Sequence, residues 1–254
     1  MAQESRNGGV ARFSFDGQPI DYAALDAFID WCHSVTNDPE IRALAIETRS
    51  EGDAGDDMGA WPAHLAHRHP EGSHGPGPLL EQEAIKVLRG CMKPTIAILE
   101  GDTLGLAFDF ACTCDIRIAS DTARLGDPRI HQGRAAATGI AYLLPKLIGQ
   151  SQAMRLLLLG EIVEAAEARR MQLVHKTWPE ADFRAEAEAL VRQIAAMPTR
   201  AWEVHKLQVL PQLDLPFDAA MVHSLGVRQT HVIEDRLEGM KAWRERRDPE
   251  FTGR

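Results

Sequence analysis

The chain has 254 residues and a mass of 28.1 kDa, which suits one large domain or one domain with a small addition. Its formal net charge of -9 and pI near 5.6 argue against a nucleic-acid groove or an anionic membrane surface as the main partner. No apolar run approaches the length that spans a bilayer, and MAQESRNGG lacks the apolar centre of a signal peptide, so we expect a cytoplasmic protein.

The first fifty residues predict a strand–helix–strand unit. VARFSF (residues 10–15) alternates as a strand does, IDYAALDAFIDWCHSV (20–35) has apolar residues at helical spacing, and RALAIET (42–48) is a second strand. A helix between two strands favours a parallel pair.

Residues 50–78 are rich in Gly, Pro and His and predict a long loop, which in a compact domain is usually functional or disordered. Four of its histidines crowd together: His64, His67, His69 and His74. Their spacing lacks the helical i, i+4 pairing of a zinc protease, so we expect a solvated loop and no metal.

The middle of the chain predicts a buried sheet interrupted by one short helix. Residues 79–91 form a helical pattern, and PTIAILEG (94–101) is a nearly continuous apolar strand, typical of a sheet covered on both faces. A glycine turn and an apolar helical segment follow, then the strand DIRIAS (115–120) and an apolar turn around 124–126.

The second half is mostly helical, with a short strand at 174–179. The helices expected are 139–147, 152–159, 163–171, 181–196, 199–209 and 217–246. The apolar faces of such a tail must be buried, either on the chain's own core or on a neighbouring subunit.

The four cysteines are expected to be reduced thiols that take no part in catalysis. They are Cys32, Cys91, Cys112 and Cys114, and the last two form a C-x-C pair, which matches neither a zinc ribbon nor a redox C-x-x-C motif.

Asp109 is the carboxylate in the apolar segment after Gly105, about one helical turn into it. Burial raises a carboxyl pKa, which suits acid–base chemistry near neutral pH. The alternative is an acid stabilised by the positive end of the helix dipole. Both interpretations remain open.

Two turns that follow strands, Gly52–Met58 and the turn at Gly101–Gly105, could present backbone N–H groups at one crevice. Two converging N–H groups stabilise the enolate of a thioester. Ordinary strand–helix turns are the alternative. Arg129 and His131, in DPRIHQGR, follow the DIRIAS strand, where a surface turn is the alternative.

Three segments resemble the enoyl-CoA hydratase/isomerase family, the crotonase superfamily, and the match runs from about Arg42 to the end. The segments are PTIAILEGDTLGLAFDFACTCDIRIASDTARLGDPRI, LIGQSQAMRLLLLGEIVEAAEARRMQLVHKTWP and EDRLEGMKAWRERRDPEFTG. The resemblance implies an α/β fold, a crotonase-like spiral of ββα units with a C-terminal helical trimerisation region. The spiral core would occupy residues 1–196 and the helical region 197–254, assembled as a homotrimer or a dimer of trimers.

The resemblance also implies an acyl thioester substrate, usually of coenzyme A, with no cofactor apart from that coenzyme A. Its carbonyl would lie between the backbone N–H groups of Asp56, in AGDDM, and Leu106, in LGLAFD. Ala54, Gly55 and Gly105 would line the substrate at these two turns. Leu106 replaces a customary glycine.

The departures from the family pattern concern catalysis. The first of the two glutamates of family hydratases falls on Asp109 and the second on Arg129, whose guanidinium cannot exchange a proton near neutral pH. The family's R-N-A-L element is also missing, because the chain reads DGQPIDYAALDAF. Hydration by two glutamates is therefore not expected.

Three functions remain open. In a non-hydratase enzyme, Asp109 would be the acid/base, Arg129 would hold a substrate carboxylate or a second oxygen, and His131 and Glu83 would be further proton carriers. In an atypical hydratase, loop histidines would replace the lost glutamate. The third is a weakened thioester-binding subunit. An enzyme should have Asp109 in a closed pocket with a shifted pKa, whereas the subunit should have a collapsed pocket or an Arg129–Asp109 ion pair.

Overall fold

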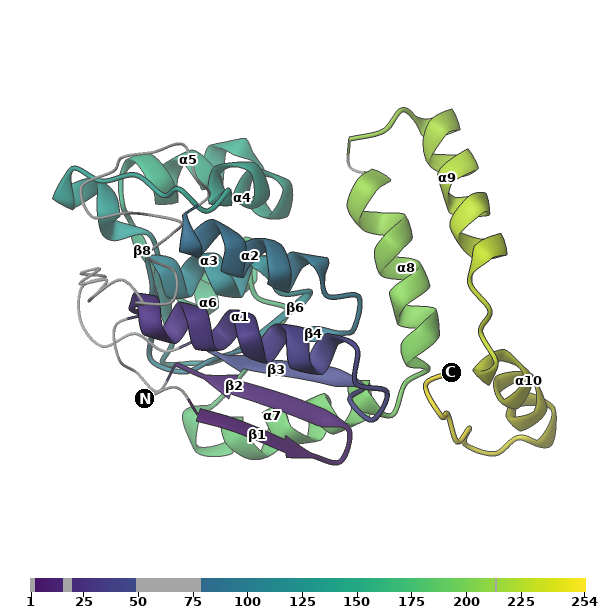
Figure 1. Ribbon diagram of the computed structural model, residues 1–254. Helices are drawn as coiled ribbons and strands as arrows, with labels where there is room; N and C mark the ends of the chain where they lie inside the picture. The colour runs from purple at the N-terminus through teal and green to yellow at the C-terminus, as the bar shows by residue number, and fades with distance from the viewer. Residues whose placement is uncertain (1–2, 16–19, 49–78, 213) are drawn as a thin grey trace.

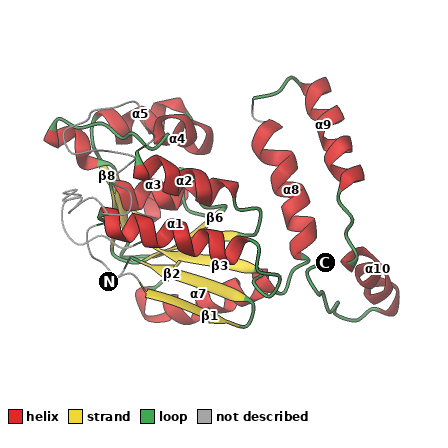
Figure 2. Cartoon of the chain, in the orientation of Figure 1, coloured by secondary structure: helices red, strands yellow, loops and turns green. Residues whose placement is uncertain are grey.

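A six-stranded sheet and a three-stranded sheet form the framework of the computed structural model, which describes residues 3–15, 20–48, 79–212 and 214–254 (Figures 1 and 2). The larger sheet has the order β1 (Gln3–Asn7), β2 (Val10–Ser14), β3 (Ala43–Glu47), β4 (Thr95–Leu99), β6 (Ile116–Ser120), β9 (Lys176–Trp178). The smaller has the order β5 (Asp102–Leu104), β7 (Arg124–Gly126), β8 (Ile162–Glu164).

Most pairs in the larger sheet are parallel. β1 runs antiparallel to β2, whereas β2, β3, β4, β6 and β9 pair in parallel. The parallel β2–β3 pair predicted from the strand–helix–strand pattern is confirmed, with Val10 opposite Ala43. The carboxyl ends of these strands therefore meet at one edge of the sheet.

Helices cover both faces of the larger sheet. α1 (Tyr22–Thr36), α2 (Leu80–Gly90) and α3 (Leu106–Thr113) lie on one face, and α7 (Glu180–Ala195) lies on the other (Figure 1). Alternate residues of β3 divide between the two cores: Leu44 and Ile46 join the first, and Ala43 and Ala45 the second. Both faces being covered explains the apolar sequences of β3 and β4.

The remaining elements lie after β7. They are the short 3-10 helix η2 (Pro128–Gln132), α4 (Ile140–Ile148), α5 (Gln150–Leu158), α6 (Ala165–Arg170), α8 (Thr199–Gln212), α9 (Phe217–Thr230) and α10 (Asp235–Glu245). In Figure 1, α8, α9 and α10 stand beside the sheet rather than on it.

The structure corrects three expected elements. The turn around 124–126 is strand β7, the helix expected at 163–171 is β8 followed by α6, and the helix expected at 217–246 is interrupted between α9 and α10. Strands β1 and β5 were not predicted. The three strands of the smaller sheet have three residues each, too few to show a period of two.

Polar contacts attach the C-terminal part of the chain to the core. Arg42, just before β3, donates through Nη1 to the Phe251 carbonyl at 2.7 Å and through Nη2 to the Met197 carbonyl at 2.6 Å. Lys206 of α8 pairs with Asp115 at 2.9 Å. The boundary expected near residue 197 thus lies where the chain is hydrogen-bonded to Arg42, next to β3.

All four cysteines are buried and free. Burial raises the pKa of the Cys32 and Cys112 thiols, and it raises that of Cys114 to about 12. Thiols of this kind are poor nucleophiles at neutral pH. Within the described ranges, no helix has the length and apolar character needed to cross a bilayer.

Candidate active site

The entrance to α3 depends on a glycine. Gly105 has φ 59° and ψ -120°, a backbone conformation that residues with a Cβ atom rarely adopt. The chain turns there from β5 into α3, and Leu106 becomes the first residue of the helix. The Leu106 N–H finds no acceptor among the described residues. A free donor at the positive end of a helix is suited to an oxyanion.

Arg117 fixes the opposite end of α3. Its buried side chain donates through Nη1 to the Cys114 carbonyl at 2.6 Å and through Nε to the Leu173 carbonyl at 2.7 Å. A cation at the carboxyl end of a helix satisfies its last carbonyls and complements its dipole. The carboxyl end of α3 is therefore held in place.

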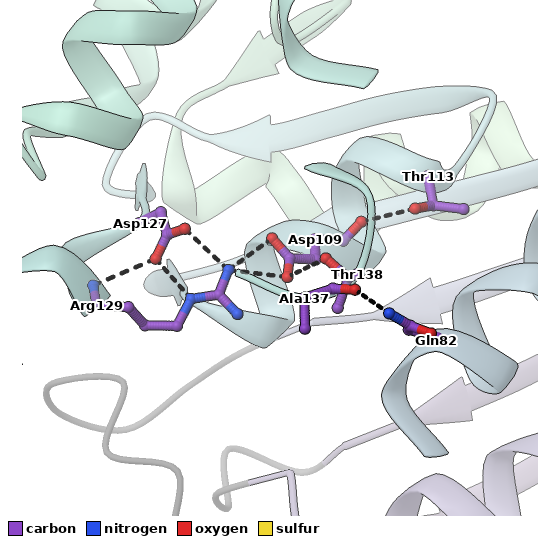
Figure 3. Close-up of polar contacts among 7 residues, drawn as sticks. All are labelled: Gln82, Asp109, Thr113, Asp127, Arg129, Ala137 and Thr138. Atoms are coloured by element: carbon purple, nitrogen blue, oxygen red, sulfur yellow. Dashed lines mark hydrogen bonds and ion pairs between the residues drawn. The ribbon is translucent and has the colours of Figure 1, made fainter. Parts of the chain in front are cut away.

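Asp109 lies in the first turn of α3 and is only 1% exposed. Nη2 of Arg129 donates to both of its carboxylate oxygens, at 2.9 Å (Oδ1) and 2.8 Å (Oδ2) (Figure 3). The Thr138 hydroxyl donates to Oδ2 at 2.7 Å. Every hydrogen bond to this carboxylate from the described residues thus comes from Arg129 or Thr138.

Asp127 binds the same guanidinium from the other side (Figure 3). Its Oδ1 accepts from Nε of Arg129 at 2.7 Å, and its Oδ2 accepts from Nη2 at 2.9 Å. Asp127 is also the N-cap of η2, accepting from the Arg129 N–H at 3.2 Å, with Pro128 as the first residue of that turn. Nη1 of Arg129 donates to none of the described residues.

The buried cluster therefore contains two carboxyl groups and one guanidinium. Burial raises the pKa of Asp109 to about 7, and Arg129 and the Thr138 hydroxyl oppose this rise without cancelling it. Asp127 raises it further as a second negative charge. Although burial lowers the pKa of Arg129, the two carboxylates raise it more, so this residue stays protonated.

A family model described as enoyl-CoA hydratase/isomerase matches residues 18–254. The chain belongs to the enoyl-CoA hydratase/isomerase family.

Several members of this family are similar to the chain over part of their length. A probable enoyl-CoA hydratase of Mycobacterium bovis is 35% identical over 162 residues, and the (E)-benzylidenesuccinyl-CoA hydratase of Thauera aromatica is 34% identical over 165 residues. Each match covers 63% of this chain and 63% of the relative. The chain therefore spans less than two thirds of these relatives.

The fold similarity extends over the whole chain. The enoyl-CoA hydratase structure from Bacillus anthracis has a TM-score of 0.84 at 20% identity, covering 100% of this chain and 99% of that one. An enoyl-CoA hydratase structure from Geobacillus kaustophilus has a TM-score of 0.83 at 23% identity and covers 100% of both chains. These structures show the crotonase-like α/β fold that the sequence predicts.

The structure brings together two of the four predicted catalytic residues, Asp109 and Arg129. His131 is exposed and has its ring beside Gly160, where a Cβ atom would lie 2.6 Å from Nε2. Glu83 is half-buried on α2 and makes no direct hydrogen bond to Asp109.

Other predicted residues lie outside the described part of the chain. They are the oxyanion residue Asp56, its neighbours Ala54 and Gly55, and the loop histidines His64, His67, His69 and His74. Among the residues that the structure does describe, no three His, Cys, Asp or Glu side chains are grouped as metal ligands.

Two site residues were missed from the sequence, Asp127 and Thr138. The signal for Asp127 was present, because Asp-Pro is typical of the N-cap and first residue of a helical turn. Thr138 precedes α4 without any local signal. Its segment is held by Gln82 of α2, which donates to the Ala137 carbonyl at 2.7 Å (Figure 3).

Proposed function

We propose that the chain binds an acyl-CoA thioester and moves a proton within its acyl group, with Asp109 as the proton carrier. The observation that carries this proposal is the buried Asp109 carboxyl, whose pKa is raised to about 7, one helical turn after the Leu106 N–H, which has no acceptor in the described part of the chain. A carboxyl group of that pKa can both accept and release a proton at neutral pH. Membership of the family supports the thioester as substrate.

A single acid/base group suits isomerisation better than hydration. Asp109 would remove a proton from C2 of a 3-enoyl thioester, the electrons would move to the carbonyl oxygen, and the resulting dienolate would take the proton back at C4. The product is the 2-enoyl thioester, with no water or co-reactant consumed. The N–H groups of Leu106 and Asp56 would stabilise the enolate oxygen.

The contacts of Arg129 limit the roles that this residue can have in the reaction. Asp127 occupies the Nε and Nη2 edge of the guanidinium. Arg129 therefore has no free pair of N–H groups for the bidentate binding of a substrate carboxylate that the sequence suggested. Its charge is also offset by two carboxylates. Nη1 can therefore donate to a neutral substrate oxygen more readily than it can hold an anion.

The Asp109–Arg129 ion pair supports a second candidate, a thioester-binding subunit without turnover. If Arg129 held Asp109 permanently ionised, that carboxylate would be too weak a base to remove a proton from the substrate. We favour the enzyme because Asp127 competes for the same guanidinium.

We further propose that the protein assembles as a trimer or a dimer of trimers through its C-terminal helices. Large apolar side chains there are exposed, including Phe217 at 76% and Trp243 at 82%. A groove of about 680 Å³ lies beside α10 and is lined by Met240, Trp243 and Phe251 among others. Exposed apolar surface of this extent marks an interaction site.

The test uses two thioesters and one variant. Wild-type protein is incubated with a 3-enoyl-CoA, followed by the gain of conjugated enoyl absorbance, and with crotonyl-CoA, followed by its loss. We expect isomerisation without hydration, and no isomerisation by Asp109→Asn. Hydration lost in that variant would make the protein an atypical hydratase. Binding of both thioesters without any turnover would favour the second candidate.

A further inference from the structure

Among the described residues, Asp127 makes no hydrogen bond to α3 or to the Gly101–Gly105 turn before it. It does accept two hydrogen bonds from the side chain of Arg129, which also binds Asp109. Asp127 is only 4% exposed, and a carboxylate at a buried position stays charged only when it is paired or hydrogen-bonded. The contacts with Arg129 meet this requirement. They also leave Arg129 with fewer N–H groups to stabilise the Asp109 carboxylate.

The geometry of the sharing is unequal. Asp127 takes Nε and one direction of Nη2, the bidentate edge that a guanidinium usually presents to one carboxylate. Asp109 is left with Nη2 alone, reached by both of its oxygens. One positive charge is therefore shared by two buried negative charges, and one added proton would make the cluster neutral.

We propose that Asp127 is a positioning residue that acts through Arg129: by occupying the bidentate edge of the guanidinium, it keeps a proton available at the Asp109 carboxyl. This inference deepens the proposed function and rests on the role given there to Asp109. Asp127 and Thr138 have opposite effects. Asp127 disfavours the Asp109 anion, and the Thr138 hydroxyl, by donating to Oδ2, favours it.

Several other titratable side chains lie on the elements around α3. β4, β5, α2 and α4 pack against this helix. Their titratable side chains are Asp102 of β5, Glu81, Glu83, Lys86 and Arg89 of α2, and Tyr142 and Lys146 of α4; β4 has none. On α3 itself, Cys112 is neutral because burial raises its thiol pKa. The main influences on Asp109 are its burial, Arg129, Thr138 and Asp127.

The experiment reads the proton on Asp109 without any substrate. Infrared difference spectra of the whole protein, recorded across the neutral range, report the C=O band of a protonated buried carboxyl group, and Asp109→Asn identifies that band by its loss. In wild-type protein the band should disappear with a midpoint near neutrality. A wild-type band that is absent throughout this range would overturn the inference.

Asp127→Asn keeps an oxygen for the N-cap and removes the charge, so it should lower the midpoint by about one pH unit or more, roughly a tenfold loss of proton affinity. Thr138→Val should raise it. Asp102→Asn, which alters an exposed Asp–Arg pair with Arg124, should leave it unchanged. An unchanged or raised midpoint in Asp127→Asn contradicts the proposal. If that variant does not fold, Asp127→Ser retains a capping oxygen and is read in the same way.

The two proposals fail separately. An unshifted midpoint in Asp127→Asn, with isomerisation still lost in Asp109→Asn, removes the positioning role and leaves the proposed function standing. A midpoint that shifts as expected in a protein whose turnover does not need Asp109 removes the proposed function instead.

Discussion

Asp109 and Asp127 bind the same nitrogen atom, Nη2 of Arg129, at 2.8 and 2.9 Å. The two carboxylates therefore share one cation. In water this would matter little, but all three side chains are nearly fully buried, where charge is costly and each shared contact counts. The proton that would restore balance belongs on Asp109, which has the weaker share of the guanidinium.

Substitution of Asp109 should separate catalysis from binding. Asp109→Asn preserves size and one acceptor oxygen for Arg129 but cannot carry a proton, so we expect kcat to fall by about 10²- to 10⁴-fold. The dissociation constant of the thioester, measured by calorimetry, should change little. Asp109→Glu restores a proton carrier one methylene longer and should recover part of the rate. Full turnover by Asp109→Asn would remove this residue from the mechanism.

The pH dependence of stability should also depend on Asp109. Its pKa is about 7 in the folded chain and is expected near the ordinary value of 3.8 in the unfolded chain, so between these values the folded state holds more protons. Stability from this group is thus greatest at low pH and is lost as the pH rises through about 7. Urea unfolding at fixed protein concentration should show a shallower decline over this window for Asp109→Asn. Parallel curves for the two proteins would contradict the raised pKa.

Removal of the Arg129 guanidinium should be far more destabilising than removal of a surface one. Arg129→Met leaves two buried carboxylates without a cation, and breaking a buried pair in this way costs about 3–5 kcal/mol of unfolding free energy. Arg124→Met is the matched control, because Arg124 pairs with Asp102 at the surface with 52% of its side chain exposed, where about 1 kcal/mol or less is expected. Equal losses, measured by chemical unfolding, would show that the cluster is not a buried ionic unit.

The sequence predicted the elements whose signals are local. The apolar strand before the Gly101 turn, the small residues after Gly105 and the DIRIAS pattern specify β4, α3 and β6 within a few residues. Asp109 was found because a carboxylate is conspicuous in that apolar setting. These signals come from neighbours along the chain, which is where periodicity operates.

What the sequence could not predict depends on contacts between distant segments. Asp109 is 20 residues from Arg129 and 29 from Thr138, so their meeting depends on how η2 and the start of α4 fold back over α3. The break between α9 and α10 is similar. Asp235, at the start of α10, accepts from the Thr252 and Gly253 N–H groups, a contact with the C-terminal tail that no pattern in residues 217–246 reveals.

The exposed apolar face of the C-terminal helices leads to the last prediction. Trp243 of α10 and Phe217 of α9 would be unusual as water-exposed side chains of a monomer, so sedimentation equilibrium of wild-type protein should give three or six times the 28.1 kDa chain mass. Trp243→Glu places a charge on this face and should shift the protein to smaller species. Leu159→Glu, a comparable change beyond the end of α5 at a residue that is 60% exposed, should leave the trimer intact. A wild-type protein that sediments at the mass of one chain would contradict the proposed assembly.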